Sequence, residues 1–201
     1  MAQNIEIKAF VSNLTRALDL LTGNCASSGE PEEQIDIFFF SPIGRIKLRY
    51  CGPETGILIF YERSDQAEPK LSTYETYVTH NPKQLEKVLR ASYDVELVVR
   101  KVRRKFGYRN AIIHLDSVQD LGDFIEVEVE LDGHQSREEI EALMCEIVGL
   151  LEINPCDLVK SAYADLIKAK DLRNGKIKNG MKTRIECMVS GQHVRRQNLW
   201  R

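Results

Sequence analysis

Apolar and polar residues alternate strictly in several segments of this chain, and residues 123–132 show the pattern most clearly. They read DFIEVEVELD, in which four aliphatic residues alternate with Phe124, Glu126, Glu128 and Glu130. Successive side chains of a strand leave opposite faces, so this segment has one apolar and one acidic face. Carboxylates two residues apart repel one another unless water or a cation separates them. The segment therefore predicts a half-buried strand whose polar face needs a cation or solvent.

The same pattern, together with turn and cap signals, predicts about eight strands and four helices. The strands are expected at 4–11, in a hairpin at 34–50 that turns at 42–44, and at 56–63, 70–78, 95–108, 110–118 and 123–132. The helices are expected at 14–21, 81–93, 136–151 and 154–169. The order shows no βαβ alternation, so we expect a mainly β (α+β) protein without a parallel sheet.

Composition describes an ordinary globular protein. The chain has 201 residues, of which 43% are hydrophobic and 29% charged. No apolar run reaches the roughly 18 residues that a spanning helix needs, and the N-terminus has no signal pattern. The five cysteines are scattered and form no C-x-x-C pair, which is typical of reduced thiols. We therefore expect no membrane partner and a cytoplasmic location, with the protein a monomer or homodimer.

The distribution of charge distinguishes the C-terminal residues 170–201 from the rest of the chain. Residues 170–201 contain nine Lys or Arg and two acidic residues, whereas the remainder contains 19 basic and 28 acidic residues. We expect one domain over residues 1–169, followed by a flexible basic extension over 170–201. The net charge of −2 does not favour a nucleic-acid partner, although the basic tail leaves one open.

The polar faces of the expected strands divide by sign. The acidic ones carry Glu6, Asp116, Glu126, Glu128 and Glu130; the basic ones carry Arg45, Lys47, Arg49, Lys101 and Arg103. These faces are either the wet sides of an open sheet or the lining of a closed barrel whose apolar outside packs under helices. In a barrel, the carboxylates would hold a hard cation such as Mg²⁺ or Mn²⁺, and the basic residues would bind a polyphosphate.

Four motifs, in order along the chain, resemble those of the CYTH superfamily of triphosphate tunnel metalloenzymes. The segment NIEIK at residues 4–8 resembles the family's E-x-E-x-K, and GRIKLR at 44–49 resembles its basic hairpin arm. RKVRR at 100–104 resembles its K-x-R strand. HLDSVQDLGDFIEVEVEL at 114–131 is similar to its most specific segment, an Asp followed by L-G-x-F-x-E-x-E.

The resemblance implies an eight-stranded antiparallel closed β-barrel wrapped by helices, with a triphosphate in its tunnel. It implies that Glu6, Glu126 and Glu128 coordinate Mg²⁺ or Mn²⁺, with Asn4 at a fourth ligand position. Lys8 would orient or activate the nucleophile, and Asp116 would lie near a second metal or the attacking group. The implied triphosphate contacts are Lys47, Arg49, Lys101 and Arg103, with Arg45 near one end of the tunnel.

Two departures from the family pattern bear on the reaction. Asn4 replaces a glutamate, which removes one anionic ligand. The strand at 56–63 lacks a lysine near its end and has Glu62 and Arg63 there, with their direction left open by parity. His114 has the parity of Asp116, and Asp36 that of Gln34; each pair either reaches the tunnel or serves only packing and solvation.

Three functions follow from the resemblance. The first is metal-dependent hydrolysis of an organic or inorganic triphosphate, a small-molecule substrate. The second is cyclisation of ATP to cyclic AMP with release of pyrophosphate. The third, suggested by Asn4, is a protein that binds a triphosphate or nucleotide with weakened turnover. Processing of RNA 5′-triphosphates, helped by the basic tail, is a further hypothesis.

Overall fold

The computed structural model describes residues 1–25, 29–66, 68–131 and 135–175. Within these ranges the chain forms eight strands, four α-helices and one short 3₁₀ turn at Pro155–Asp157. The strands are β1 (Ala2–Val11), β2 (Pro31–Phe39), β3 (Arg45–Tyr50), β4 (Gly56–Arg63), β5 (Lys70–Thr79), β6 (Val95–Tyr108), β7 (Ala111–Val118) and β8 (Gly122–Glu130). The helices are α1 (Leu14–Asn24), α2 (Pro82–Ser92), α3 (Arg137–Leu150) and α4 (Tyr163–Arg173).

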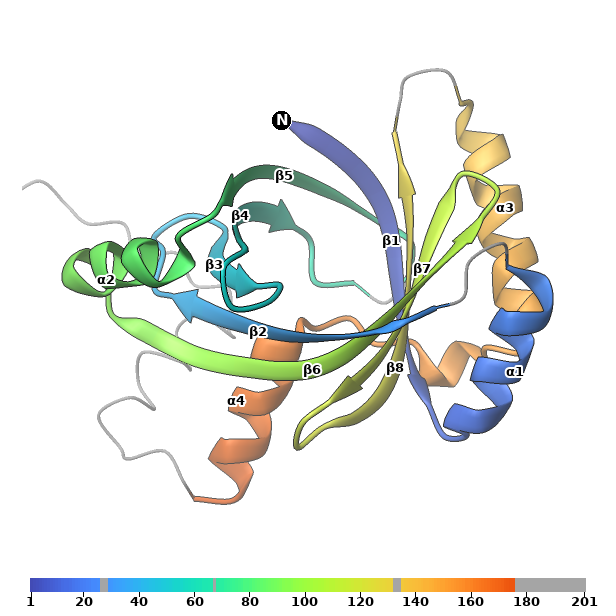
Figure 1. Ribbon diagram of the computed structural model, residues 1–201. Coiled ribbons are helices and arrows are strands. Elements are labelled where there is room, and N and C mark those ends of the chain that lie inside the picture. The colour runs from blue at the N-terminus through green and yellow to red at the C-terminus, as the bar shows by residue number, and fades with distance from the viewer. Residues whose placement is uncertain (26–28, 67, 132–134, 176–201) are drawn as a thin grey trace, which may run out of the picture. The chain divides into compact units, whose positions relative to one another are not determined.

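The strands close into an antiparallel barrel in the order β1-β5-β4-β3-β2-β6-β7-β8, with β8 pairing back to β1 (Figure 1). Closure gives each of the eight described strands a partner on both sides, which removes the open edges of the sheet. The expectation of a closed eight-stranded antiparallel barrel with helices outside it is confirmed. The alternative of an open sheet is wrong.

The barrel turns its apolar faces outward. On one side α1 and α3 pack over β1, β7 and β8 (Figure 1). The residues buried there include Leu21 of α1, Ile113 of β7, Val127 of β8 and Ile147 of α3, each with no exposed surface. A smaller cluster joins Leu89 of α2 to the outer faces of β2 and β3. Because the helices take up the apolar faces, the polar faces are left for the interior.

Local signals place the first three helices where they were expected. Asn13 and Asn81 accept hydrogen bonds from the backbone N–H groups of Arg16 and Gln84, at 3.0 and 3.2 Å. Ser136 and Glu139 cap each other reciprocally at the start of α3. The turn between β2 and β3 needs a glycine, because Gly44 has φ +58 and a Cβ there would lie 2.8 Å from the carbonyl oxygen of Tyr61.

The expectation of a single helix over 154–169 is wrong. After the 3₁₀ turn the chain is extended, and the backbone N–H of Val159 donates to the carbonyl of Lys8 at 2.8 Å. Leu158 forms a bridge with Ala9, and α4 begins only at Tyr163. Pairing with the backbone of β1 outcompeted helix formation, and it creates the segment of residues 158–163 that we call the crossing segment.

The chain divides into one compact unit that ends at Ala164 and another that begins at Asp165. The first contains the barrel and the crossing segment. The second contains most of α4, where Lys168 and Asp165 are paired at 3.6 Å. The predicted flexible extension begins within α4, and its residues 176–201 lie outside the described part of the chain. No helix in the described ranges is both long and apolar enough to cross a membrane.

Candidate active site in the tunnel

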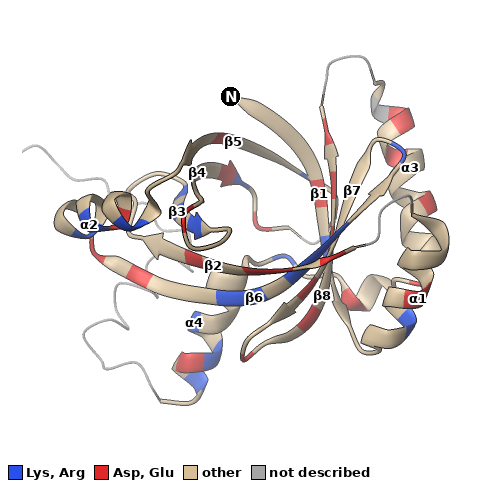
Figure 2. Ribbon diagram, in the orientation of Figure 1, with Lys and Arg blue, Asp and Glu red and all other residues tan. Residues whose placement is uncertain are grey.

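A cavity of about 420 Å³ lies inside the barrel and is lined by side chains from all eight strands. Much of its wall is charged, whereas a protein interior is normally apolar. Lysines and arginines gather on β6, and acidic residues on β2 and β8 (Figure 2). The size suits one small ligand, and the charges suit a polyanion together with a cation.

Nine of the predicted site residues line this cavity: Asn4, Glu6, Lys8, Lys47, Arg49, Lys101, Arg103, Glu126 and Glu128. Arg45, Asp116 and Glu130 do not. Arg45 is paired with Asp65 at 3.2 Å, and Glu130 is exposed. Asp116 is buried behind the wall with no exposed surface. Alternation along each strand explains why these nine residues share the cavity, because every second side chain of a strand points inward.

The basic side of the tunnel contains two similar units, each made of an aspartate, an arginine and a lysine. In the first, Arg49 donates two hydrogen bonds to Asp36, at 2.7 and 2.8 Å, and Lys47 donates one at 2.9 Å. Burial raises the pKa of Asp36, but Arg49 and Lys47 outweigh it and hold that pKa well below its usual range. A paired guanidinium fork fixes both side chains in position.

Asp116 is the centre of the second unit. Arg103 donates to both of its oxygens, at 2.7 and 2.6 Å, and Lys101 approaches at 3.4 Å. The hydroxyl of Tyr163 donates to the same carboxylate at 2.9 Å. With these donors in place, Asp116 holds Lys101, Arg103 and Tyr163 from behind the wall.

The two cations of this second unit differ in how easily they lose charge. The pKa of Lys101 falls to about 7, because burial and then the neighbouring charges of Arg103 and Arg49 disfavour its charged form. The pKa of Arg103 is raised well above its usual value, since Asp116 and Glu126 outweigh burial. An anionic ligand would restore the charge of Lys101.

The acidic side joins the basic side at Glu126. This carboxylate is paired with Lys8 at 3.0 Å and also with Arg103. Burial raises its pKa, but Lys8 and Arg103 outweigh burial and hold the pKa well below the usual range. Arg103 therefore touches the carboxylates of both Asp116 and Glu126.

Glu6 and Glu128 lie directly opposite each other on β1 and β8. Glu6 is paired with Arg63, and Glu128 has His114 Nε2 at 3.6 Å. Burial raises the pKa of Glu128, yet His114 outweighs it, and the pKa falls to about 2. Glu128 is therefore charged at neutral pH, and Glu6 is held by the cationic side chain of Arg63.

A hard divalent cation fits this donor set. Asn4 donates from Nδ2 to Glu128 at 3.4 Å, which leaves its buried Oδ1 without a hydrogen-bond partner in the described part of the chain. A buried amide oxygen beside two carboxylates is the ligand type that Mg²⁺ and Mn²⁺ prefer. The described residues contain no preassembled group of three or more His, Cys, Asp or Glu for a metal. Glu6 would have to leave Arg63 to serve as a ligand.

The crossing segment places Tyr163 and Ala162 in the cavity wall. Lys8 Nζ lies 3.8 Å from the centre of the Tyr163 ring and donates to the carbonyl of Ser161 at 3.3 Å. The same ring packs edge-on against Phe124. Tyr163 thus fixes the ammonium group of Lys8 from one side, while Glu126 fixes it from the other.

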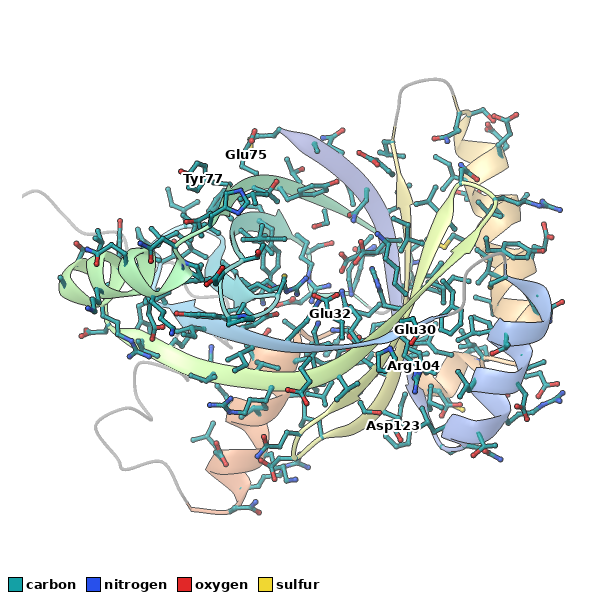
Figure 3. All side chains as sticks on the ribbon, in the orientation of Figure 1. Glu30, Glu32, Glu75, Tyr77, Arg104 and Asp123 are labelled. Carbon is teal, nitrogen blue, oxygen red and sulfur yellow. The ribbon has the colours of Figure 1, made fainter. Side chains whose placement is uncertain are left out.

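Sequence reasoning missed Tyr163, Lys70 and Glu32, and it left Arg63 and Asp36 open. Tyr163 was hidden by the expected helix; Ser161, a residue that favours helix N-termini, was the available signal. Lys70 is buried and donates to the carbonyls of Gln66 and Lys160, at 3.2 and 3.3 Å. Glu32 and His114 line the cavity (Glu32 is labelled in Figure 3).

A family model for the CYTH domain matches residues 2–163. The chain belongs to the CYTH domain family. The match ends at Tyr163, so it includes every strand of the barrel and the crossing segment. A comparison with curated protein sequences found no match.

Solved structures share the fold of this CYTH domain at low sequence identity. A conserved hypothetical protein from Pyrococcus furiosus has a TM-score of 0.71 at 21% identity, covering 81% of this chain and 99% of that one. A candidate adenylate cyclase from Vibrio parahaemolyticus has a TM-score of 0.65 at 18% identity, covering 82% and 97%. A candidate adenylyl cyclase from Hippeastrum, described as having a dominant triphosphatase activity, has a TM-score of 0.58 at 14% identity, covering 89% and 98%.

Proposed function

We propose that this CYTH domain protein binds a triphosphate in its tunnel and hydrolyses it with a divalent metal ion. The observation that carries the proposal is that the lysines and arginines of two Asp-Arg-Lys units line the same cavity as glutamates of β1 and β8. Lys47, Arg49, Lys101 and Arg103 would contact the phosphates. Family membership and the activity described for the Hippeastrum protein support hydrolysis as the reaction.

The residues take different roles. Glu6, Glu128 and Asn4 would hold Mg²⁺ or Mn²⁺, with Glu126 close by; the bound ion would draw charge from the phosphate that it contacts. Lys8, fixed between Glu126 and Tyr163, would orient the attacking water by a hydrogen bond. Asp116 would act as a positioning residue rather than contact the substrate, because it is fully buried and its oxygens are bonded to Arg103 and Tyr163.

A binding protein with weak turnover is the second candidate. It is favoured by the saturation of the carboxylates, since Glu6 is paired with Arg63 and Glu126 with Lys8 and Arg103. Asn4 adds to this, because an amide oxygen neutralises no metal charge. In such a protein the triphosphate would bind the cations while the metal remained weakly held.

Product analysis separates these functions. The full chain is incubated with ATP, thiamine triphosphate and tripolyphosphate, each with Mg²⁺ and with Mn²⁺. Orthophosphate release means hydrolysis, whereas cyclic AMP with pyrophosphate means cyclisation. Glu128→Gln should abolish either product, and Glu130→Gln, an exposed glutamate on the same strand, should not. Binding without product would support the second candidate and overturn the first.

A further inference from the structure

β4 differs from the other strands of the barrel because three successive inward positions, before Arg63 at its end, carry Ile or Tyr rather than charged residues. Ile57, Ile59 and Tyr61 line the cavity. Leu58, between them, packs outward against the cluster beneath α2. A strand that only had to support a charged tunnel would carry polar residues at its inward positions.

The adjacent strand β5 extends this uncharged surface. Tyr74 is paired in register with Tyr61, and Thr76 with Ile59, and both line the cavity. Directly opposed residues of an antiparallel pair point to the same face and lie in contact distance. We call the surface of Ile57, Ile59, Tyr61, Tyr74 and Thr76 the neutral wall.

Binding of an inorganic polyphosphate would not require the neutral wall. Tripolyphosphate carries charge along its whole length, and the two Asp-Arg-Lys units already offer it cations. Ile57, Ile59, Tyr61 and Tyr74 are only partly buried, so they present apolar surface to the cavity. Apolar surface grouped in a concave site is typical of contact with an organic ligand.

The neutral wall is adjacent to the predicted phosphate contacts. Ile59 is paired in register with Lys47, and Ile57 with Arg49. Lys47 Nζ lies 5.6 Å from the centre of the Tyr61 ring. A group attached to a phosphate that Lys47 and Arg49 hold would therefore lie against this wall.

We propose that the neutral wall binds the organic part of the substrate, a flat heteroaromatic group joined to the triphosphate, and so makes this protein selective for organic triphosphates. The inference rests on the proposed binding of a triphosphate in the same tunnel. Tyrosine rings and isoleucine side chains give a heteroaromatic ring a stacking and packing surface. The hydroxyls of Tyr74 and Thr76 provide the few polar contacts that fix its orientation.

Two tyrosines on one strand provide a matched test. Tyr74 points into the tunnel, while Tyr77 leaves the outer face of β5 and is 63% exposed (Figure 3). Tyr74→Thr and Tyr77→Thr make the same chemical change on opposite faces with a residue that strands tolerate. Ile57→Thr/Ile59→Thr removes the apolar part of the wall and keeps β-branched side chains. Affinities for ATP, thiamine triphosphate and tripolyphosphate are measured by calorimetry in EDTA, where metal-dependent turnover stops.

The expected result is that ATP or thiamine triphosphate binds about tenfold or more tightly than tripolyphosphate, the scale of one stacking contact. Tyr74→Thr and the isoleucine double variant should remove that preference and change tripolyphosphate affinity by less than about twofold. Tyr77→Thr should leave all affinities unchanged. Comparing ATP with thiamine triphosphate shows which ring fits.

Equal affinity of the unmodified protein for all three ligands would overturn the inference. So would a loss of tripolyphosphate affinity as large as the loss for the organic ligands. Because binding is measured apart from turnover, a preference without product would contradict the proposed hydrolysis and leave the neutral wall supported. Product from tripolyphosphate, without tighter binding of the organic triphosphates, would support the proposed hydrolysis and contradict the role of the neutral wall.

Discussion

Asp36 and Asp116 neutralise buried cations on the basic side of the tunnel. Each accepts two hydrogen bonds from an arginine fork and one from a lysine. A buried charge that loses its partner costs far more than an exposed one. These aspartates therefore stabilise the protein while keeping the cations oriented toward the cavity.

Replacing Asp36→Asn should lower the free energy of unfolding by about 3 kcal/mol, because Lys47 and Arg49 lose a buried anion. Tripolyphosphate should restore part of that loss by supplying negative charge. Urea unfolding with and without tripolyphosphate measures both effects. Asp65→Asn, which removes the 51% exposed partner of Arg45, is the control and should cost less than about 1 kcal/mol. Equal losses in the two variants would contradict the prediction.

Lys101 should take up a proton when a triphosphate binds. Its pKa of about 7 leaves it partly neutral above that pH, and an anion favours the charged form and raises the pKa. Between pH 7 and 8 we expect proton uptake on binding and an affinity that falls as the pH rises. Calorimetry in two buffers of different ionisation enthalpy measures the uptake. In Lys101→Arg the uptake should largely disappear, since arginine stays charged; unchanged uptake would assign it to another group, such as Lys70 with its pKa of about 8.

At the scale of elements, the crossing segment links the backbone of β1 to the interior of the barrel. Val159 is hydrogen bonded to the backbone of Lys8, and Ser161 accepts from the side chain of the same residue. Lys70 is bonded to the carbonyl of Lys160. Two buried lysines thus hold the segment that places Tyr163 in the cavity wall.

Two substitutions of Tyr163 should distinguish the contribution of its ring from that of its hydroxyl. Tyr163→Phe keeps the ring over Lys8 and loses the bond to Asp116, so unfolding free energy should fall by about 1 kcal/mol with kcat little changed. Tyr163→Leu also loses the ring, and kcat should fall about tenfold with a small change in KM, because Lys8 is less well positioned. Thermal unfolding and steady-state kinetics measure the two effects. A rise in KM alone in the leucine variant would show that Tyr163 contacts substrate instead.

At the scale of the whole molecule, the cavity-lining side chains within the described ranges all come from residues 4–163. The family match covers nearly the same span. These described residues line the cavity from all eight strands.

Truncation after Gly175 should therefore leave tripolyphosphate affinity within about twofold of that of the full chain. A ligand at about 100 times its Kd should stabilise both forms by about 2.7 kcal/mol. Thermal unfolding at several tripolyphosphate concentrations tests this. A smaller rise of the unfolding temperature in the truncated form would assign the extension a part in ligand binding. A loss of RNA affinity alone would support the hypothesis of a role on RNA 5′-triphosphates.

The sequence by itself determined the barrel and most of its lining. Strict alternation in β1, β6 and β8 decides which side chains share a face, since the period of a strand is two. Four motifs in order identified the family. Parity put Glu6, Lys101, Arg103, Glu126 and Glu128 on polar faces, and the family resemblance added Lys8. The structure places all six in one cavity.

Only the tertiary structure decided which inward residues reach the cavity and what they touch. Asp116 and Glu126 both have inward parity on neighbouring strands. Asp116 is nevertheless buried behind Arg103, whereas Glu126 lines the cavity. β4 shows no polar alternation before Glu62 and Arg63, so parity could not show that Arg63 meets Glu6. The helical pattern of residues 154–169 yielded to a backbone pairing with β1 that no local pattern encodes. Alternation is a property of one strand, whereas contacts depend on strand register, barrel closure and segments distant in the chain.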